Sequence, residues 1–249
     1  VQGFMAGVNA AMKIMGREQI VLDRSQAYIG VLIDDLVTKE NHEPYRMMTS
    51  RAEYRLLLRQ DNADLRLRGI GHEIGLVSDE EYERLLTKRR QIEEEIRRLG
   101  KVNIGAGDEV QKFLEEHNST LLKSGITLAE LVKRPELNYG LLACLDPDRP
   151  ELSEDVQEQV NIEIKYEGYI KRQMQQVAQF KKLEGKKLPE AFDYGQVKSL
   201  RREAVQKLNQ VQPATVGQAS RISGVSPADI SVLLVHLEQM KGKESGKEE

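Results

Sequence analysis

The longest uninterrupted pattern in the chain is a run of helical periodicity that begins at Ser153 and continues to residue 185. Along it, apolar side chains recur three or four positions apart, at Val156, Val160, Ile164, Ile170, Met174, Val177 and Phe180. This spacing places them on one face of an α-helix. At 1.5 Å per residue, a helix of about 30 residues would be roughly 45 Å long. The run therefore predicts a mainly α-helical fold, a bundle organised around one long central helix.

Shorter patterns fill the rest of the chain. Ser78 and Glu81 match a capping box, which predicts a charged helix from there to about Leu99. Ser25 is a plausible N-cap for a helix over residues 25–39, and Asp61 for one that begins near residue 62. Further helices are predicted over residues 1–16, 108–117, 127–133, 136–145, 195–208 and 215–240.

The segment around Tyr54 has a different pattern. Tyr54, Leu56 and Leu58 alternate with other residues, which predicts a small β element. We therefore expect a small mixed α/β linking region within residues 1–70, followed by a helical domain over residues 71–240. The charged end, residues 241–249, is expected to be a disordered tail.

Composition and missing motifs exclude several classes of function. No stretch approaches the roughly 20 apolar residues of a membrane helix, so no membrane partner is expected. The single cysteine, Cys144, excludes a disulfide framework, and its apolar context predicts a buried thiol. The four histidines lack metal-ligand spacing, and there is no GxGxxG, P-loop or GxSxG motif. We predict no metal site and no catalytic residue, in a cytoplasmic protein.

Arginine is concentrated between residues 46 and 68. Six arginines face three carboxylates there, a local charge of +3 within a chain whose net charge is −3. Arg51, Arg55 and Arg59 are spaced so that either a strand or a helix would place them on one face. Guanidinium groups bind phosphate through two parallel hydrogen bonds. The segment is thus either a phosphate-binding surface or a solvated face paired with nearby carboxylates.

A second basic set lies on and after the long helical run. Residues 171–187 carry a charge of +5, because one glutamate faces the basic residues Lys171, Arg172, Lys181, Lys182, Lys186 and Lys187. Such a set can follow a nucleic-acid backbone through counterion release. A solubilising lysine face is the alternative.

The stretch from Thr215 to Met240 is similar to a helix–turn–helix. Thr215 and Ser226 are good N-caps, Gly224 supplies the turn, and Pro227 occupies a first helical position. A DNA reader needs basic or amide side chains on its second helix. Here that helix offers acidic and apolar ones, so docking of a protein partner fits better than major-groove binding.

Four blocks together resemble one family. They are QGFMAGVNAA (2–11), the whole of residues 24–67 with EPYRMMTSRAEYRLLLR within it, EIKYEGYIKRQ (163–173), and TVGQASRISGVSPADISVLLVHLE (215–238). They resemble the C-terminal part of the MnmG (GidA) family, FAD-dependent enzymes that form 5-carboxymethylaminomethyl uridine at the tRNA wobble position. The resemblance implies that this chain is part of a longer protein whose FAD domain ends in the helix at residues 2–15. This would explain why the small-residue face of Gly3, Ala6, Gly7 and Ala10 has no evident partner within this chain.

The resemblance also implies cofactors, partners and site residues. FAD and NADH would serve the full-length enzyme, a homodimer that works with the GTPase MnmE, and this chain alone would bind neither cofactor nor catalyse the reaction. Arg46 and Arg55 would bind tRNA, with Arg51 and Arg59 as neighbours in the motif. We add Lys171, Arg172, Lys181 and Lys182 as candidate tRNA contacts. Candidate contacts to MnmE are Gln218, Arg221, Ile230 and Leu234. The alternative is a purely structural domain that supports the dimer and the GTPase.

Overall fold

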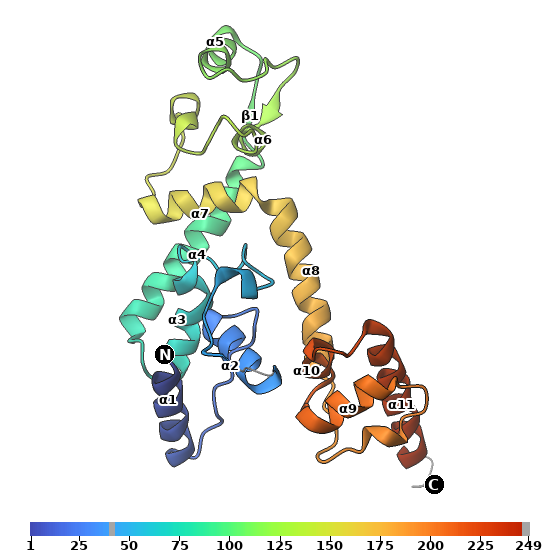
Figure 1. The fold of residues 1–249 in the computed structure, drawn as a ribbon. Coiled ribbons are helices and arrows are strands. Elements are labelled where there is room, and N and C mark those ends of the chain that lie inside the picture. Colours follow the sequence, from blue (N-terminus) through green and yellow to red (C-terminus); the bar gives the residue numbers. More distant parts are fainter. Residues whose placement is uncertain (40–42, 246–249) are drawn as a thin grey trace. The chain divides into compact units, whose positions relative to one another are not determined.

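The computed structural model describes residues 1–39 and 43–245, with side chains described as far as residue 240. Most of these residues are helical (Figure 1). The α-helices are α1 (Gln2–Ile14), α2 (Tyr28–Thr38), α3 (Ala63–Glu73), α4 (Asp79–Leu99), α5 (Asp108–Glu116), α6 (Leu128–Val132), α7 (Glu154–Lys165), α8 (Glu167–Glu184), α9 (Arg202–Val211), α10 (Val216–Arg221) and α11 (Pro227–Ser245). Single 3₁₀ turns are η1 (Thr49–Arg51), η2 (Leu141–Leu145) and η3 (Tyr194–Gln196). The predicted mainly α fold is confirmed.

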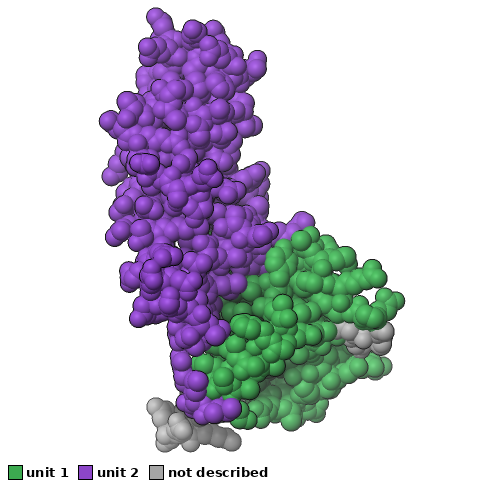
Figure 2. All heavy atoms as spheres, turned by 90° about the vertical axis from the view of Figure 1, so that its left-hand side faces the viewer, with its two compact units in different colours: residues 1–13, 18–54, 174–249 green, residues 14–17, 55–173 purple. Residues whose placement is uncertain are grey.

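The described strands form one small antiparallel sheet. In it, β1 (Asn103–Ile104) pairs with β2 (Ile126–Thr127), with Asn103 opposite Thr127 and Ile104 opposite Ile126. The chain forms two compact units (Figure 2). The first unit contains residues 1–13, 18–54 and 174–249, and the second contains residues 14–17 and 55–173. Because the first unit joins both ends of the chain, these units do not coincide with the domains expected on either side of residue 70.

The second unit is built on α4, which packs against α3 and α7. Leu99 of α4, Leu114 of α5, Leu131 of α6 and Val160 of α7 meet in its core and are almost fully buried. The predicted capping box is present at the start of α4, where the Ser78 hydroxyl accepts a hydrogen bond from the Glu81 backbone. Burial of these apolar side chains is the main stabilising contribution to the unit.

An ion cluster crosses the same core. The Arg98 guanidinium donates to both oxygens of Glu95, at 2.8 and 2.7 Å, and to both oxygens of Asp146. The Tyr139 hydroxyl also donates to Glu95, at 2.9 Å. Glu95 and Asp146 are buried, so each carboxylate depends on these donors in place of water.

In the first unit, residues 186–240 form a small helical bundle around Tyr194, Leu208 and Leu233. Its last two helices have the predicted helix–turn–helix signals. Thr215 caps α10 by accepting a hydrogen bond from the Gln218 backbone, and Gly224 in the turn has a φ of 94°. Ser226 likewise accepts a hydrogen bond from the backbone of the third residue after it. These predictions are confirmed.

The predicted strand at Tyr54–Leu58 is wrong, because residues 52–61 form turns. Side chains, instead of a neighbouring strand, satisfy the backbone carbonyls there. Arg59 donates to the Leu56 carbonyl at 2.6 Å, and Asn62 donates to the Leu57 carbonyl at 3.1 Å. The alternation of apolar residues therefore belongs to a turn that buries Tyr54 and Leu58.

The predicted single long helix is also wrong, because it is divided at Tyr166 into α7 and α8. Tyr166 has a φ of −103° and a ψ of 10°, outside the helical range. Beside it, Lys165 donates to the carbonyl of Arg134 at 3.0 Å, and Gly168 in the first turn of α8 lowers the local helix propensity.

Three smaller predictions also fail. Ser25 bonds to Asp23 and does not cap α2, whose N-cap is Ala27. Residues 136–145 contain the 3₁₀ turn η2 and no α-helix. The Asn138 side chain accepts a hydrogen bond from the Leu141 backbone there. Cys144 is exposed. Of the expected disordered tail, residues 241–245 belong to α11, and residues 246–249 lie outside the described residues.

Candidate nucleic-acid and partner interface

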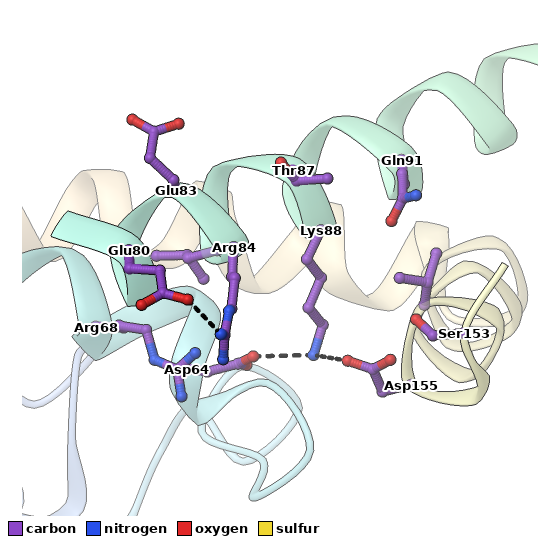
Figure 3. A pocket seen from close by; sticks show the side chains of 12 residues that line it. Asp64, Arg68, Glu80, Glu83, Arg84, Thr87, Lys88, Gln91, Ser153 and Asp155 are labelled. Atoms are coloured by element: carbon purple, nitrogen blue, oxygen red, sulfur yellow. Dashed lines mark hydrogen bonds and ion pairs between the residues drawn. The ribbon is translucent and has the colours of Figure 1, made fainter. Parts of the chain in front are cut away.

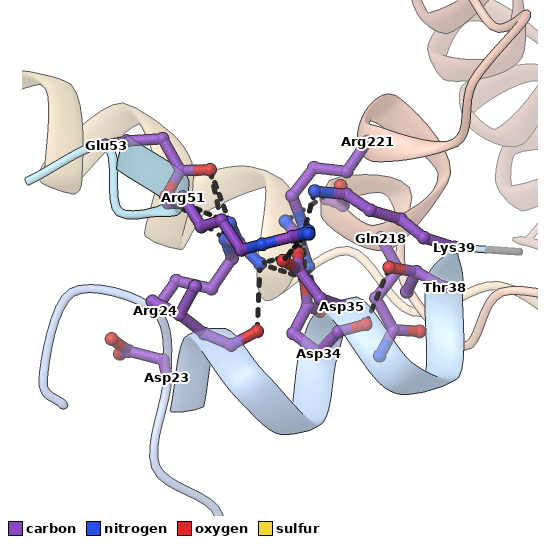
Figure 4. Close-up of polar contacts among 12 residues, drawn as sticks. Asp23, Arg24, Asp34, Asp35, Thr38, Lys39, Arg51, Glu53, Gln218 and Arg221 are labelled. Carbon is purple, nitrogen blue, oxygen red and sulfur yellow. Dashed lines mark hydrogen bonds and ion pairs between the residues drawn. The ribbon is translucent and has the colours of Figure 1, made fainter. Parts of the chain in front are cut away.

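A buried cluster of charged side chains surrounds α2 in the first unit (Figure 4). At its centre Arg24 is only 2% exposed and donates to Asp34 at 2.9 Å, Asp35 at 2.7 Å and Glu53 at 2.7 Å. Burial alone would lower the pKa of Arg24, but its hydrogen bonds to Glu53 and Asp35 outweigh burial and raise the pKa. Arg24 is therefore a permanent cation that joins the loop before α2, α2 itself and the segment after η1.

Asp35 is the buried anion of this cluster. Its carboxylate accepts hydrogen bonds from Arg24, from Lys39 at 2.8 Å and from the Tyr45 hydroxyl at 2.8 Å. Burial raises the pKa of Asp35, but the bonds from Lys39, Arg24 and Tyr45 outweigh it and hold the pKa below its ordinary value. For Tyr45, burial and the bond to Asp35 raise the pKa to about 12, so its hydroxyl stays a donor at neutral pH. The Arg51 guanidinium lies 4.4 Å from the centre of the Tyr45 ring.

Arg221 extends the cluster to α10. Its guanidinium binds Asp34 of α2 at 2.6 Å and Glu184 at the end of α8 at 2.5 Å. Thr215 donates to the same Glu184 carboxylate at 2.7 Å. Gly217 lies so close to it that a Cβ there would come within 2.2 Å of a Glu184 oxygen. A Cβ at this position would therefore displace the Glu184 side chain from its present place.

The structure separates the four predicted arginines into two kinds. Arg46 and Arg55 are exposed, and the described residues give neither of them an ion pair. Arg51 is held against Tyr45, with Asp35 at 3.8 Å. Arg59 binds Asp61 at 3.0 Å and Gln159 at 3.2 Å. The spacing argument for one shared face does not apply, because the backbone here is neither strand nor α-helix and because Arg51 and Arg55 belong to different units.

The basic residues of α8 are exposed as predicted. Lys171 and Arg172 belong to the second unit, whereas Lys181 and Lys182 belong to the first. Lys181 lies 3.7 Å from Asp23. Because an ion pair between exposed side chains is weak, the contact with Asp23 does not prevent Lys181 from binding a ligand.

The four predicted partner contacts are mostly engaged within the bundle. Ile230 is buried in its core, and Leu234 packs partly against that core. The Gln218 amide oxygen accepts from the Ala214 backbone at 2.8 Å. Sequence reasoning missed Val235, which is 55% exposed on α11. It lines a cavity of about 680 Å³ with Lys198, Ser231, His236 and Gln239 among others.

A polar cavity of about 470 Å³ lies in the second unit between α3, α4 and the start of α7 (Figure 3). Lys88 crosses it, bound to Asp64 at 2.9 Å and to Asp155 at 2.8 Å. Burial lowers the pKa of Lys88, but the bonds to Asp155 and Asp64 outweigh burial and raise it. The lysine is thus already neutralised by two carboxylates of its own unit.

Over the part of the chain that the structure describes, no three histidine, cysteine or acidic side chains group in a way that could hold a metal ion. Within that same part, no helix is both long and apolar enough to cross a membrane.

Comparison with known proteins identifies the family. Residues 79–174 match the family model "tRNA modifying enzyme MnmG/GidA C-terminal helical domain", and residues 176–249 match "tRNA modifying enzyme MnmG/GidA C-terminal helical bundle". The tRNA uridine 5-carboxymethylaminomethyl modification enzyme MnmG of Lachnoclostridium phytofermentans is 69% identical over 242 residues, which are 97% of this chain and 39% of the relative. Its counterpart in Caldicellulosiruptor saccharolyticus is 65% identical over 240 residues, 96% of this chain and 38% of the relative.

A solved structure agrees with these matches. Aquifex aeolicus GidA in its form II crystal has a TM-score of 0.79 and 39% identity, covering 95% of this chain and 37% of that one. The chain spans about 39% of the length of the relative from L. phytofermentans. By these matches the chain belongs to the MnmG/GidA family of tRNA-modifying enzymes, of which it carries the C-terminal helical domains.

Proposed function

We propose that this chain is the tRNA-binding and MnmE-binding part of an enzyme that installs the 5-carboxymethylaminomethyl group on the wobble uridine of tRNA in the cytoplasm. The reaction is that of the relatives, which are tRNA uridine 5-carboxymethylaminomethyl modification enzymes. The observation that carries the binding role is the contrast within the Arg-rich segment. Arg24, Arg51 and Arg59 are neutralised or stacked inside the protein, whereas Arg46 and Arg55 are exposed within the same block. An exposed guanidinium without an internal carboxylate is free to bind phosphate.

The flavin and NADH of such an enzyme would be held outside this chain. The nearest approach to a dinucleotide motif is β1, followed by Gly105 and Gly107 and then α5. Its strand has two residues in an antiparallel pair, and α5 begins with Asp108 and Glu109, which repel a pyrophosphate from the helix N-terminus. The described residues therefore do not fit FAD, and we assign no catalytic step to them.

The tRNA role is tested in the full-length enzyme with Arg46→Ala and Arg55→Ala. Each variant should weaken tRNA binding about tenfold, the loss expected for a charge-assisted hydrogen bond. Each should also reduce the slope of log K against log salt by about 0.7 to 0.9, one phosphate contact. Arg90→Ala is the matched control, because Arg90 is equally exposed on α4 among acidic residues. Unchanged affinity and slope in both variants would reject the role.

We further propose that the bundle at residues 186–240 contacts MnmE and that the full-length enzyme is a homodimer. Gln218 and Leu234, which are partly exposed, would lie at the surface, while Arg221 and Ile230 would act by holding α10 and α11 in place. Leu234→Asp should abolish capture of MnmE. The purely structural alternative keeps the dimer and GTPase contacts without tRNA binding, and equal tRNA affinity with and without residues 85–249 would favour it.

A further inference from the structure

Tyr45 lies between a buried anion and a half-buried cation. Its hydroxyl donates to Asp35, which is fully buried, and its ring lies under the Arg51 guanidinium. Its chain neighbour Arg46 is exposed. The bond that holds Tyr45 inward therefore fixes the residue directly before an exposed arginine.

The segment that carries these residues has little regular structure of its own. Residues 44–48 lie outside helices and strands, and only η1 follows them. Pro44 restricts the backbone just before Tyr45. Without an anchor, a surface segment of this kind loses conformational freedom when it binds, and the loss weakens binding. The hydrogen bond from the Tyr45 hydroxyl to Asp35, at 2.8 Å, connects this segment to α2.

Asp35 is suited to be such an anchor because it is itself fixed. Arg24 binds it from the preceding loop and Lys39 binds it from the end of α2. Its neighbour Asp34 shares Arg24 with it and also binds Arg221 of α10. Beyond this shared cation, Asp35 bonds toward the segment 44–51 and Asp34 bonds toward the terminal bundle.

We propose that Tyr45 and Asp35 are positioning residues for RNA binding, which hold the segment 44–51 so that Arg46 is presented to a phosphate backbone. This inference rests on the tRNA role proposed above for Arg46. Tyr45 does not touch the RNA. By fixing the backbone that carries Arg46, it reduces the conformational freedom that the segment loses when Arg46 binds a phosphate.

The test is a double-mutant cycle in the full-length enzyme, with tRNA affinity as the readout. Tyr45→Phe removes the hydroxyl but keeps the ring under Arg51, so the fold is retained, and tRNA binding should weaken about fivefold. In an Arg46→Ala background the same change should cost less than about twofold, because nothing remains to be positioned. Tyr28→Phe is the control, since it removes a hydroxyl from α2 that has no hydrogen-bond partner among the described residues.

The outcomes separate the two ideas. If Arg46→Ala leaves tRNA binding intact, this inference fails, and if Arg55→Ala leaves it intact as well, the proposed function also fails. If Arg46→Ala weakens binding but Tyr45→Phe does not, only the positioning role fails. A loss on Tyr45→Phe that is equally large in the Arg46→Ala background would also overturn it, because a general structural effect is additive with the loss of the arginine.

Discussion

Replacing Arg98 by methionine tests the ion cluster that supports the second unit. The guanidinium makes hydrogen bonds to both oxygens of Glu95 and both oxygens of Asp146. The two carboxylates are 2% and 5% exposed at their side chains, whereas Arg98 is 25% exposed. Methionine matches the aliphatic part of the arginine side chain and has no charge, so it keeps part of the packing but leaves two buried anions without a cation.

The expected cost follows from that imbalance. Removing one partner of a buried ion pair destabilises a protein by about 3–5 kcal/mol, because the remaining charge is uncompensated. Part of the Arg98 side chain reaches solvent, so water can replace part of the interaction and we expect the lower end, about 3 kcal/mol. Tyr139 still donates one hydrogen bond to Glu95 in the variant, which keeps that carboxylate partly satisfied.

Urea unfolding of the parent and the variant measures this difference. Arg97→Met is the matched control, because Arg97 is the preceding residue of α4 and is exposed. It should change stability by less than about 0.5 kcal/mol. A deficit below about 1 kcal/mol would refute the reasoning.

Two further predictions concern the first unit. Gly217→Ala should lower the free energy of unfolding by about 2 kcal/mol, because the new Cβ displaces the Glu184 carboxylate from its donors. Gly168→Ala is the control and should be neutral or stabilising, because the space around Gly168 is open. Equal effects of the two substitutions in thermal unfolding would contradict this prediction. The hydrogen bond from Arg201 lowers the pKa of Asp229, so this carboxylate stabilises the fold above its unfolded pKa of about 3.9 and loses that contribution as the pH falls through the lower folded pKa. Asp229→Asn should therefore be less stable by about 1–2 kcal/mol at neutral pH, with the gap closing in strong acid, as urea unfolding at several pH values would show.

The sequence predicted a helix start correctly where the side chain of the capping residue bonds to the backbone three residues later. The capping box at Ser78 and the cap at Thr215 depend only on contacts three residues apart. The predictions failed where a side chain forms a hydrogen bond that the regular pattern does not contain. The break at Tyr166 lies beside a lysine that bonds to carbonyls about thirty residues earlier in the chain, and the turn at residues 54–59 is held by side chains that replace the ladder of a strand.

The sequence predicted that the candidate site is rich in arginine, but it did not predict which arginines are exposed and which are paired. Counting Arg46 to Arg68 against nearby acids gives a positive surface, but Arg51 faces Asp35, and Arg59 bonds to Gln159, a hundred positions away in sequence. A family resemblance could mark the block as functional, yet it could not say which arginines are exposed. Only the folded chain shows that.

The separation of the arginines has a physical reason that applies beyond the individual residues. A guanidinium buried with carboxylates holds segments together, but its donors are then used and cannot bind a phosphate. Arg24 and Arg221 join α2, α8 and α10 in this way, and together they use Asp34, Asp35, Glu53 and Glu184. That use of the acids leaves Arg46 without a competing carboxylate partner among the described residues. A segment rich in arginine can therefore be rigid and still keep a cation for a ligand, provided that different residues hold the fold and bind the phosphate. The double-mutant cycle at Tyr45 measures how strongly the rigidity of the segment supports phosphate binding.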